Sequence, residues 1–198
     1  MPRAYTEPEQ ERIRATLLET GRDLFTQHGL SRVTVSELTQ AAGIGKGSFY
    51  LFYPSKEALF FAVQEREEAA ARASLEAALA PLEGTAAIEA FFRLQFALLD
   101  EHPFLRRLAD AQTVAALRRK LPAEQLAAHM DRDAAFTAHI VYGWVARGIV
   151  AADTDPALVH ALAASTFALA MSRDIVGTPY AEVTAVLSRA LARELTAS

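Results

Sequence analysis

The chain has 198 residues, 52% hydrophobic and 22% charged, so it can bury a substantial core and is not wholly disordered. It contains no cysteine, which excludes disulfides, thiolate nucleophiles, iron–sulfur clusters and cysteine-ligated zinc. The net charge of −4 argues against a general nucleic-acid binder, because such domains are usually basic. Residues 1–60 carry seven basic and seven acidic side chains, so binding to phosphate must depend on positioned groups.

The sequence gives no sign of export or membrane insertion. Its first residues include Arg3, Glu7 and Glu9 and lack the apolar stretch of a secretory signal. The uncharged stretch 156–172 contains His160 and is mostly Ala, Ser and Thr, so it falls short of the roughly 20 strongly apolar residues of a membrane span. We therefore expect a buried helix there and a cytoplasmic protein.

The predicted elements are helical throughout, with Gly and Pro as breaks between alanine-rich segments. Thr6 and Glu9 have the spacing of a capping box, and Gly29 is expected to close the helix that they start. Thr34 and Glu37 repeat this spacing at the start of a second helix. We expect an all-α fold of about nine helices. Their starts are expected near Thr6, Thr34, Lys46, Pro54, Thr85, Pro103, Pro122, Asp155 and Thr178.

Residues 34–59 read TVSELTQAAGIGKGSFYLFYPSKEAL and have the pattern of a helix-turn-helix. An eight-residue helix is followed by a glycine-containing turn and a seven-residue helix. Gly43 suits the turn because glycine adopts a positive φ without strain. The apolar positions of both helices are spaced to close a small core with the first helix. The second of the two helices is therefore expected to fit the major groove of DNA.

This region resembles the DNA-binding domain of the TetR family of transcriptional regulators, over residues 13–59. The matching segments are Leu17-Leu18, Leu24-Phe25, Gly29, Thr34-Val35, residues 39–45, Gly47-Ser48-Phe49-Tyr50 and Ser55-Lys56-Glu57. The 139 residues after position 59 agree only in length and helical character. The resemblance implies a three-helix DNA-binding domain at residues 1–54 and a helical effector-binding and dimerisation domain at residues 55–198.

The resemblance also implies three contacts with DNA phosphates. Thr34 and Lys56 lie at helix N-termini, where backbone dipoles favour anions, and Tyr50 would donate its hydroxyl. Thr34 and Ser55 could instead serve only as caps, which is worth about 1 kcal/mol each. Capping does not explain why Lys46, Tyr50 and Lys56 are expected near one surface, so DNA contact is favoured for these three.

Base contacts are implied for the start of the recognition helix. Lys46 and Ser48 would read base edges, with lysine suited to guanine O6 and N7. Gly47 would let the helix backbone approach the DNA closely.

The recognition segment also departs from the family pattern at several positions. Gly45 stands where a Ser or Thr cap is usual, so this helix start is weaker. Leu51 and Phe52 stand where His or Tyr often contact DNA, and Tyr53 stands at the usual Phe position. The core and surface roles of these aromatic residues could therefore be exchanged.

The C-terminal part carries three polar side chains on apolar, aromatic-rich helix faces: Gln95, Gln112 and His139. Each alone could be a core side chain bonded to backbone or water. Ligand pockets combine a few polar groups with mostly apolar walls, and the TetR resemblance implies a small-molecule pocket here. The expected lining is Phe92, Gln95, Phe96, Gln112, Phe136 and His139.

The last two helices combine Leu and Val with small residues that permit close helix approach. In TetR-like proteins two such helices pair with their copies in a four-helix bundle; alternatively, both stripes pack within one chain. A dimer would present two recognition helices about 34–36 Å apart to successive major grooves of a palindromic site. The expected interface residues are Leu162, Ser165, Leu169, Val183, Leu187 and Leu191.

Enzyme and metal motifs are missing from the sequence, including a Gly-rich phosphate loop and Gly-x-Ser-x-Gly. His129 and Asp133 could form half a metal site, but no third ligand is spelled out. We expect no catalytic residues, metal or cofactor. The hypothesis is a homodimeric repressor that binds a palindromic operator and is released by a small-molecule effector. The alternative is a helical small-molecule-binding protein whose helix-turn-helix no longer reads DNA.

Overall fold

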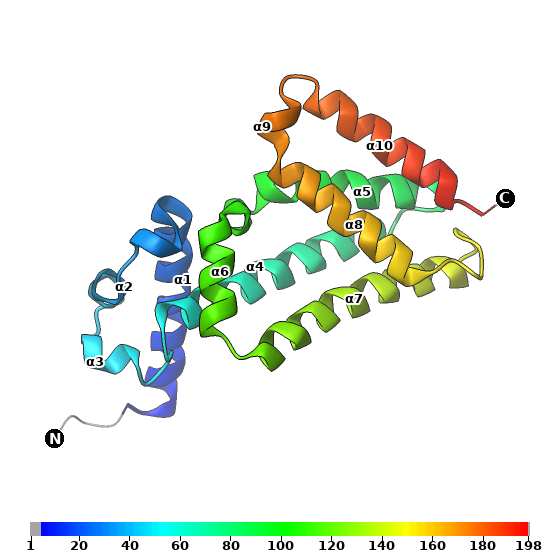
Figure 1. Ribbon diagram of the computed structural model, residues 1–198. Helices are drawn as coiled ribbons and strands as arrows, with labels where there is room; N and C mark the ends of the chain where they lie inside the picture. Colours follow the sequence, from blue (N-terminus) through cyan, green and yellow to red (C-terminus); the bar gives the residue numbers. More distant parts are fainter. Residues whose placement is uncertain (1–4, 198) are drawn as a thin grey trace. The chain divides into compact units, whose positions relative to one another are not determined.

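The structure is a computed structural model that describes residues 5–197, and over that range it is helical with no strand (Figure 1). An isolated antiparallel bridge joins Val150 and Thr196. The expected all-α fold is thus confirmed. In chain order the elements are α1 (Glu7–Arg32), α2 (Val35–Ala41), α3 (Lys46–Phe49), α4 (Lys56–Leu79), α5 (Gly84–Glu101), the 3-10 helix η1 (Pro103–Ala109), α6 (Ala111–Lys120), α7 (Ala123–Ala146), α8 (Pro156–Met171), α9 (Arg173–Val176) and α10 (Tyr180–Leu195).

The described residues form eleven helices instead of about nine, because two segments divide more finely than expected. The segment after Pro103 is η1 followed by α6, since the Asp110 carboxylate accepts the backbone N–H of Gln112 at 3.0 Å and so starts a new helix. A short helix, α9, lies between α8 and α10. It ends at Gly177, whose φ is 73°.

The helix boundaries of the N-terminal region follow the local signals in the sequence. Both capping boxes are present, at Thr6 with Glu9 and at Thr34 with Glu37. Gly29 has a φ of 77° and interrupts the helical geometry of α1, where the helix was expected to close. Helix α3 ends at Phe49, earlier than expected, because the next N–H groups bond to carbonyls only three residues back.

The chain forms two compact units, and α4 contributes residues to both. The first unit contains the described residues up to Glu68 together with Pro103–Ala123. Its core is rich in aromatic side chains: the Phe25 and Phe60 ring centroids lie 5.2 Å apart, and those of Phe60 and Phe104 lie 4.7 Å apart. These rings fix α1, the start of α4 and η1 against one another.

The second unit contains Ala69–His102 together with the described residues from Glu124 onward. Both α8 and α10 pack on α5. At the centre of this unit the Phe91 ring meets the Trp144 ring edge-on at 5.4 Å. Residues 156–171 form α8, which buries Val159, Ala163, Thr166 and Ala170. Among the described residues, no helix has the length and apolar character needed to cross a membrane.

Candidate nucleic-acid interface

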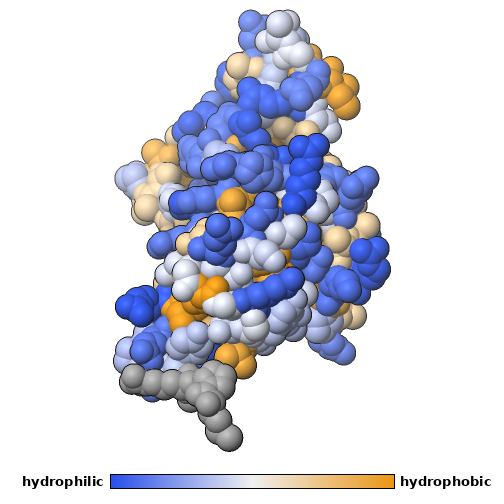
Figure 2. All heavy atoms as spheres, turned by 90° about the vertical axis from the view of Figure 1, so that its left-hand side faces the viewer, coloured by the Kyte–Doolittle hydropathy of each residue, from blue (hydrophilic) through white to orange (hydrophobic). Residues whose placement is uncertain are grey.

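The short helix α3 packs on α2 and presents Lys46 to solvent. Leu38 of α2 and Phe49 of α3 are fully buried, and the Phe49 ring meets that of Tyr50 edge-on at 5.4 Å. Lys46 and Gly47 are exposed, and the Tyr50 side chain is 54% exposed. Figure 2 looks at the side that carries α2 and α3 and shows a mostly hydrophilic surface with small, separate hydrophobic patches.

Thr34 completes the capping box at the start of α2. Its Oγ1 accepts the Glu37 backbone N–H at 3.2 Å, while its hydroxyl and its backbone N–H each donate to Glu37 Oε2 at 2.7 Å. These hydrogen bonds lower the pKa of Glu37. A phosphate bound through the Thr34 hydroxyl would therefore have to replace Glu37, and the phosphate contact implied for Thr34 stays a prediction.

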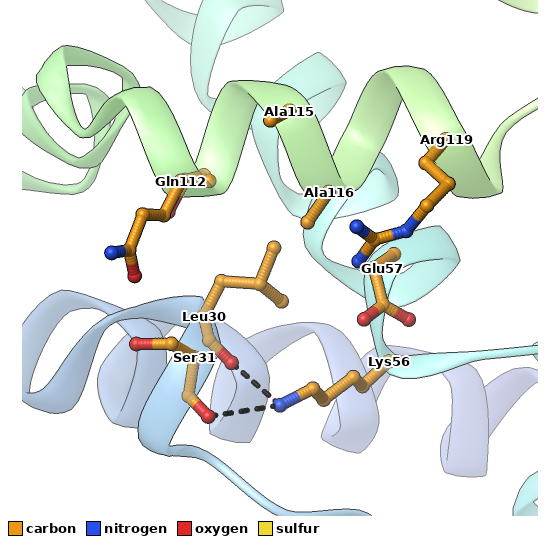
Figure 3. A pocket seen from close by; sticks show the side chains of 9 residues that line it. Leu30, Ser31, Lys56, Glu57, Gln112, Ala115, Ala116 and Arg119 are labelled. Atoms are coloured by element: carbon orange, nitrogen blue, oxygen red, sulfur yellow. Dashed lines mark hydrogen bonds between the residues drawn. The ribbon is translucent and has the colours of Figure 1, made fainter.

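The Lys56 ammonium group lies against the end of α1. Its Nζ donates to the carbonyl oxygens of Leu30 at 2.7 Å and Ser31 at 3.3 Å (Figure 3). It also donates to the carbonyl oxygen of Val33 at 2.7 Å. An ammonium group has three N–H donors, so these contacts use all of them. The geometry assigns Lys56 to capping α1, and the phosphate contact implied by the TetR resemblance stays a prediction that competes with this role.

A second cation caps the same end of α1, and the sequence did not indicate it. Arg107 of η1 donates from Nε to the Thr26 carbonyl oxygen at 3.0 Å and from Nη2 to the Gln27 carbonyl oxygen at 3.0 Å. Nη2 also donates to Thr26 O. Cations are favoured where a helix leaves its last carbonyls exposed. The partners are about 80 residues apart in the chain, so no local pattern reveals the contact.

Ser48 does not face solvent alone, because the Tyr5 hydroxyl donates to its Oγ at 3.0 Å. The Phe52 ring is half-buried near Tyr5, at 6.0 Å between ring centroids. Burial raises the pKa of Tyr53, whereas Leu51 is 72% exposed. Phe52 and Tyr53 thus both pack partly against the protein, and Leu51 is the apolar side chain of this segment that remains available for contact.

Gln112 lies apart from the other residues expected to line the effector pocket. It borders a pocket of about 430 Å³ within the first unit, together with Leu30, Ser31, Lys56 and Arg119 (Figure 3). The other five expected residues belong to the second unit. Gln112 therefore does not share a compact unit with them.

In the second unit the expected pocket residues divide between the core and the surface. Phe92 and Phe96 are buried, Gln95 is half-buried, and Phe136 packs against the core. The His139 side chain is 76% exposed, with its Nε2 3.8 Å from Glu76 Oε1. His139 therefore faces outward in the single chain, away from the inward position expected for it.

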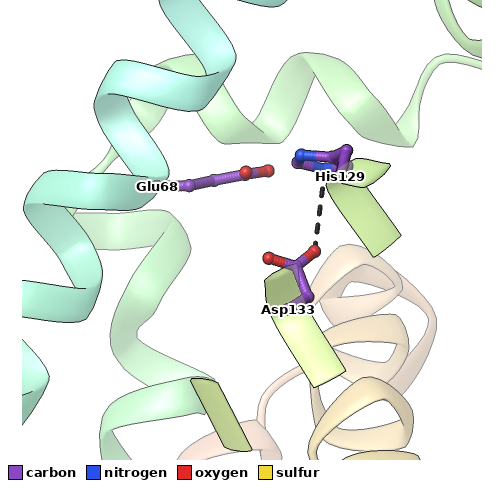
Figure 4. Close-up of side chains that lie close together, drawn as sticks. All are labelled: Glu68, His129 and Asp133. Atoms are coloured by element: carbon purple, nitrogen blue, oxygen red, sulfur yellow. Dashed lines mark ion pairs between the residues drawn. The ribbon is translucent and has the colours of Figure 1, made fainter. Parts of the chain in front are cut away.

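A polar cluster that the sequence revealed only in part lies along α7. Arg72 of α4 pairs with Asp133 at 2.8 Å, and its guanidinium lies 6.0 Å from the Phe136 ring centroid. One turn earlier, His129 Nε2 is 3.6 Å from Asp133 Oδ2 (Figure 4). The spacing of His129 and Asp133 is visible in the sequence. The pairing with Arg72 is not, because it joins residues 61 positions apart.

A further polar contact links α7 to α8. Thr137 Oγ1 lies 3.1 Å from His160 Nδ1, and Thr137 is buried. A buried hydroxyl beside an imidazole is a pair of groups that can recognise a polar ligand.

The helices expected to form a dimer interface leave apolar side chains in solvent. Leu158 of α8 is 53% exposed, Val186 and Leu187 of α10 are 55% and 36% exposed, and Ile175 of α9 is 86% exposed. The expected interface residues Leu162, Leu169, Val183 and Leu191 are half-buried, and Ser165 is exposed. Packing on α5 therefore leaves part of both stripes uncovered.

Comparison with known proteins places the helix-turn-helix in a defined family. The sequence model for bacterial regulatory proteins of the tetR family matches residues 17–63. The HTH-type transcriptional regulator RutR of Escherichia coli K12 is 29% identical over 160 residues, which cover 76% of this chain and 70% of RutR. The HTH-type transcriptional repressor NemR of the same strain is 46% identical over 57 residues, or 29% of each chain.

Solved structures share the fold over nearly the whole chain. A TetR-family regulator from Pectobacterium atrosepticum has a TM-score of 0.69 at 21% identity and covers 98% of this chain and 99% of its own. FadR from Bacillus subtilis, in complex with stearoyl-CoA, has a TM-score of 0.59 at 12% identity and covers 92% and 97%. These structures show a shared fold, and the family model and the curated relatives point to a DNA-binding transcriptional regulator and not to an enzyme. Residues 17–63 thus match the tetR family of bacterial regulatory proteins, and the chain as a whole is similar to helix-turn-helix transcriptional regulators.

Proposed function

We propose that the protein represses transcription as a homodimer that binds a palindromic operator and releases it when a small-molecule effector binds. The observation that carries the proposal is the arrangement of α3, where buried Phe49 anchors the helix and Lys46, Gly47 and Tyr50 face solvent. The Lys46 cation on α3 and the Tyr50 hydroxyl directly after this helix suit the base edges and phosphates of a major groove.

The proposed dimer is supported by the uncovered apolar surface of α8–α10. One short recognition helix offers few contacts, whereas two copies related by symmetry contact successive major grooves and add their binding energies. A second copy of this surface would cover Leu158, Val186 and Leu187 and remove their apolar side chains from water. The proposed symmetric contact would include Leu162, Ser165, Leu169, Val183, Leu187 and Leu191.

The proposed effector site lies in the second unit along α7. Phe92, Phe96 and Phe136 supply apolar wall, and Gln95 remains a polar contact. Arg72, beside the Phe136 ring, and the pair of Thr137 with His160 are the polar groups that we propose for this site in place of Gln112 and His139. Stearoyl-CoA bound to the structurally similar FadR supports a small-molecule effector, although it does not identify one for this chain.

Release of the operator requires coupling between the effector site and the DNA-binding surface. An effector lowers operator affinity only if it binds the DNA-free conformation more tightly than the DNA-bound one. Helix α4 contributes residues to both compact units and is the proposed carrier of this coupling. We propose that residues 1–54 form the DNA-binding domain and that residues 55–198 form the domain for effector binding and dimerisation. We also propose a cytoplasmic location, where the DNA is found.

The experiment is selection of binding sites from random duplexes with the full chain, followed by gel-shift measurements on the selected duplex. We expect a palindromic site, a dimer in analytical ultracentrifugation, and weaker binding by Lys46→Ala and Tyr50→Phe. Failure to enrich any duplex would favour the alternative, a ligand-binding protein whose helix-turn-helix does not read DNA. Enrichment of a non-palindromic site by a monomer would retain DNA binding and reject the dimer.

A further inference from the structure

Tyr5 precedes α1 in the chain and reaches across to α3. Its hydroxyl lies 3.0 Å from Ser48 Oγ, and its ring packs beside Phe52 at 6.0 Å between centroids. Ser48 is one of the two residues expected to read bases. The segment before α1 therefore touches the recognition helix at a position that matters for sequence preference.

The backbone that carries Tyr5 is held by local hydrogen bonds. The Thr6 backbone N–H donates to Glu9 Oε2 at 2.7 Å in the capping box, and Gln10 Nε2 donates to the Tyr5 carbonyl oxygen at 3.2 Å. These contacts fix the direction in which the chain enters α1. Tyr5 consequently reaches Ser48 from a defined starting point.

The Phe52 ring is the aromatic neighbour of the Tyr5 ring. The Arg14 guanidinium lies 5.6 Å from the Phe52 ring centroid, a cation–π distance, so the Phe52 ring has Tyr5 and Arg14 as neighbours. Phe52 is half-buried in this arrangement. Its role is to hold Tyr5 in place, which accounts for an aromatic residue at a position where the TetR pattern often has a DNA-contacting His or Tyr.

The contact with Tyr5 has a chemical consequence for Ser48. A serine hydroxyl has one proton to donate and lone pairs that accept. When Tyr5 donates to Ser48 Oγ, the serine proton is left for another acceptor. In the major groove such acceptors are guanine O6 and N7, adenine N7 and thymine O4, whereas the amino groups of adenine and cytosine are donors.

We propose that Tyr5 is a positioning residue for sequence recognition: it orients the Ser48 hydroxyl as a donor, so that Ser48 prefers a base acceptor. This role rests on the proposed insertion of α3 into the major groove. Because the Tyr5 hydroxyl acts through Ser48, its removal should relax the preference at one base pair in each half-site and leave the rest of the site unchanged.

The test compares full-length wild type with Tyr5→Phe, Ser48→Ala and the double variant on the duplex that wild type selects and on all its single base-pair variants. Tyr5→Phe is expected to bind DNA, with about fivefold lower discrimination at one base pair per half-site, as for one neutral hydrogen bond. The double variant should discriminate no worse than Ser48→Ala, because both changes remove one interaction. Tyr142→Phe makes the same chemical change on an exposed side chain of α7 and should leave the profile unchanged.

The outcomes separate this inference from the proposed function. If wild type selects no duplex, the proposed DNA binding fails. If wild type selects a site and folded Tyr5→Phe keeps the full base profile, or if its effect adds to that of Ser48→Ala, the role of Tyr5 is overturned. Loss of all DNA binding by folded Tyr5→Phe would also overturn it, because Tyr5 would then serve affinity and not discrimination.

Discussion

The α3 surface and the α8–α10 surface are both exposed, and they expose different chemistry. On α3 the exposed side chains include the Lys46 ammonium and the Tyr50 hydroxyl, although Leu51 is an apolar exception. On α8–α10 aliphatic side chains such as Leu158 and Val186 are exposed beside charged side chains such as Arg189. A surface with positioned donors suits an anionic partner, and an aliphatic surface suits another protein surface. The contrast agrees with the proposal that the first surface meets DNA and the second meets another copy of the chain.

The largest expected effect is on the aliphatic surface. Leu187→Glu would place a carboxylate at the proposed contact between two copies, where its desolvation opposes association. We expect the dimer dissociation constant to rise at least about hundredfold, equal to about 2.7 kcal/mol, as measured by analytical ultracentrifugation. Met130→Glu, which alters an exposed side chain of α7, is the matched control and should leave assembly unchanged. Equal dissociation constants for Leu187→Glu and wild type would remove α10 from the interface.

The next effect concerns what holds the α3 surface in place. Lys56→Met keeps an unbranched stem of similar length and removes the ammonium that caps three carbonyls at the end of α1. Hydrogen bonds to charged groups contribute about 1.5–3 kcal/mol, so we expect the free energy of unfolding to fall by about 2 kcal/mol in urea titration. Lys46→Met alters an exposed lysine of α3 and should change stability by less than about 0.5 kcal/mol.

For DNA affinity we expect Lys46 to matter more than Lys56, the reverse of their order for stability. Lys46→Ala removes the exposed cation of α3, and we expect operator affinity to fall about tenfold, or about 1.4 kcal/mol. If Lys46 also neutralises a phosphate, the slope of log K against log salt should become shallower by about 0.9. Binding measured between low and high salt separates these contributions. An unchanged affinity would mean that the N-terminal end of α3, which carries Lys46, does not contact the major groove.

The same contrast explains how far the sequence could predict the structure. Thr34, Glu37 and Gly43 shape the backbone only a few residues away from their own positions. The cap and the turn of the helix-turn-helix could therefore be predicted from local sequence, and both are found. Lys56 and Arg107 act on the end of α1 from 23 to 81 positions away, and no local pattern reports such contacts. In the second unit, helical periodicity located the apolar stripes.

Periodicity did not settle which way each polar side chain of the second unit points. His139 was expected to face inward with Phe136 and is exposed beside Glu76. An outward turn costs little for a histidine that finds a carboxylate at the surface, so periodicity alone cannot exclude it. Gln112 likewise shared the apolar pattern of the pocket residues, but the whole segment Pro103–Ala123, which contains it, belongs to the other compact unit.

The smallest expected effect is a pH dependence at the start of α2. The Thr34 hydroxyl and backbone N–H both donate to the Glu37 carboxylate and hold the pKa of Glu37 below its ordinary value. A carboxyl whose pKa is lower in the folded state stabilises that state above its unfolded pKa. This contribution is lost as the pH falls from about 4.5 through the lower folded value.

Glu37→Gln should therefore make the acid-induced loss of stability shallower, as followed by urea titration from pH 7 to below pH 4. The pKa of Glu9 is lowered in the matching capping box at Thr6, so part of the acid sensitivity should persist in Glu37→Gln. If the variant and wild type lose stability in parallel, the capping box of α2 does not stabilise the fold through its charge. Glu37 would then act at the start of α2 only as a hydrogen-bond acceptor, and its ionisation would not contribute to the free energy of unfolding.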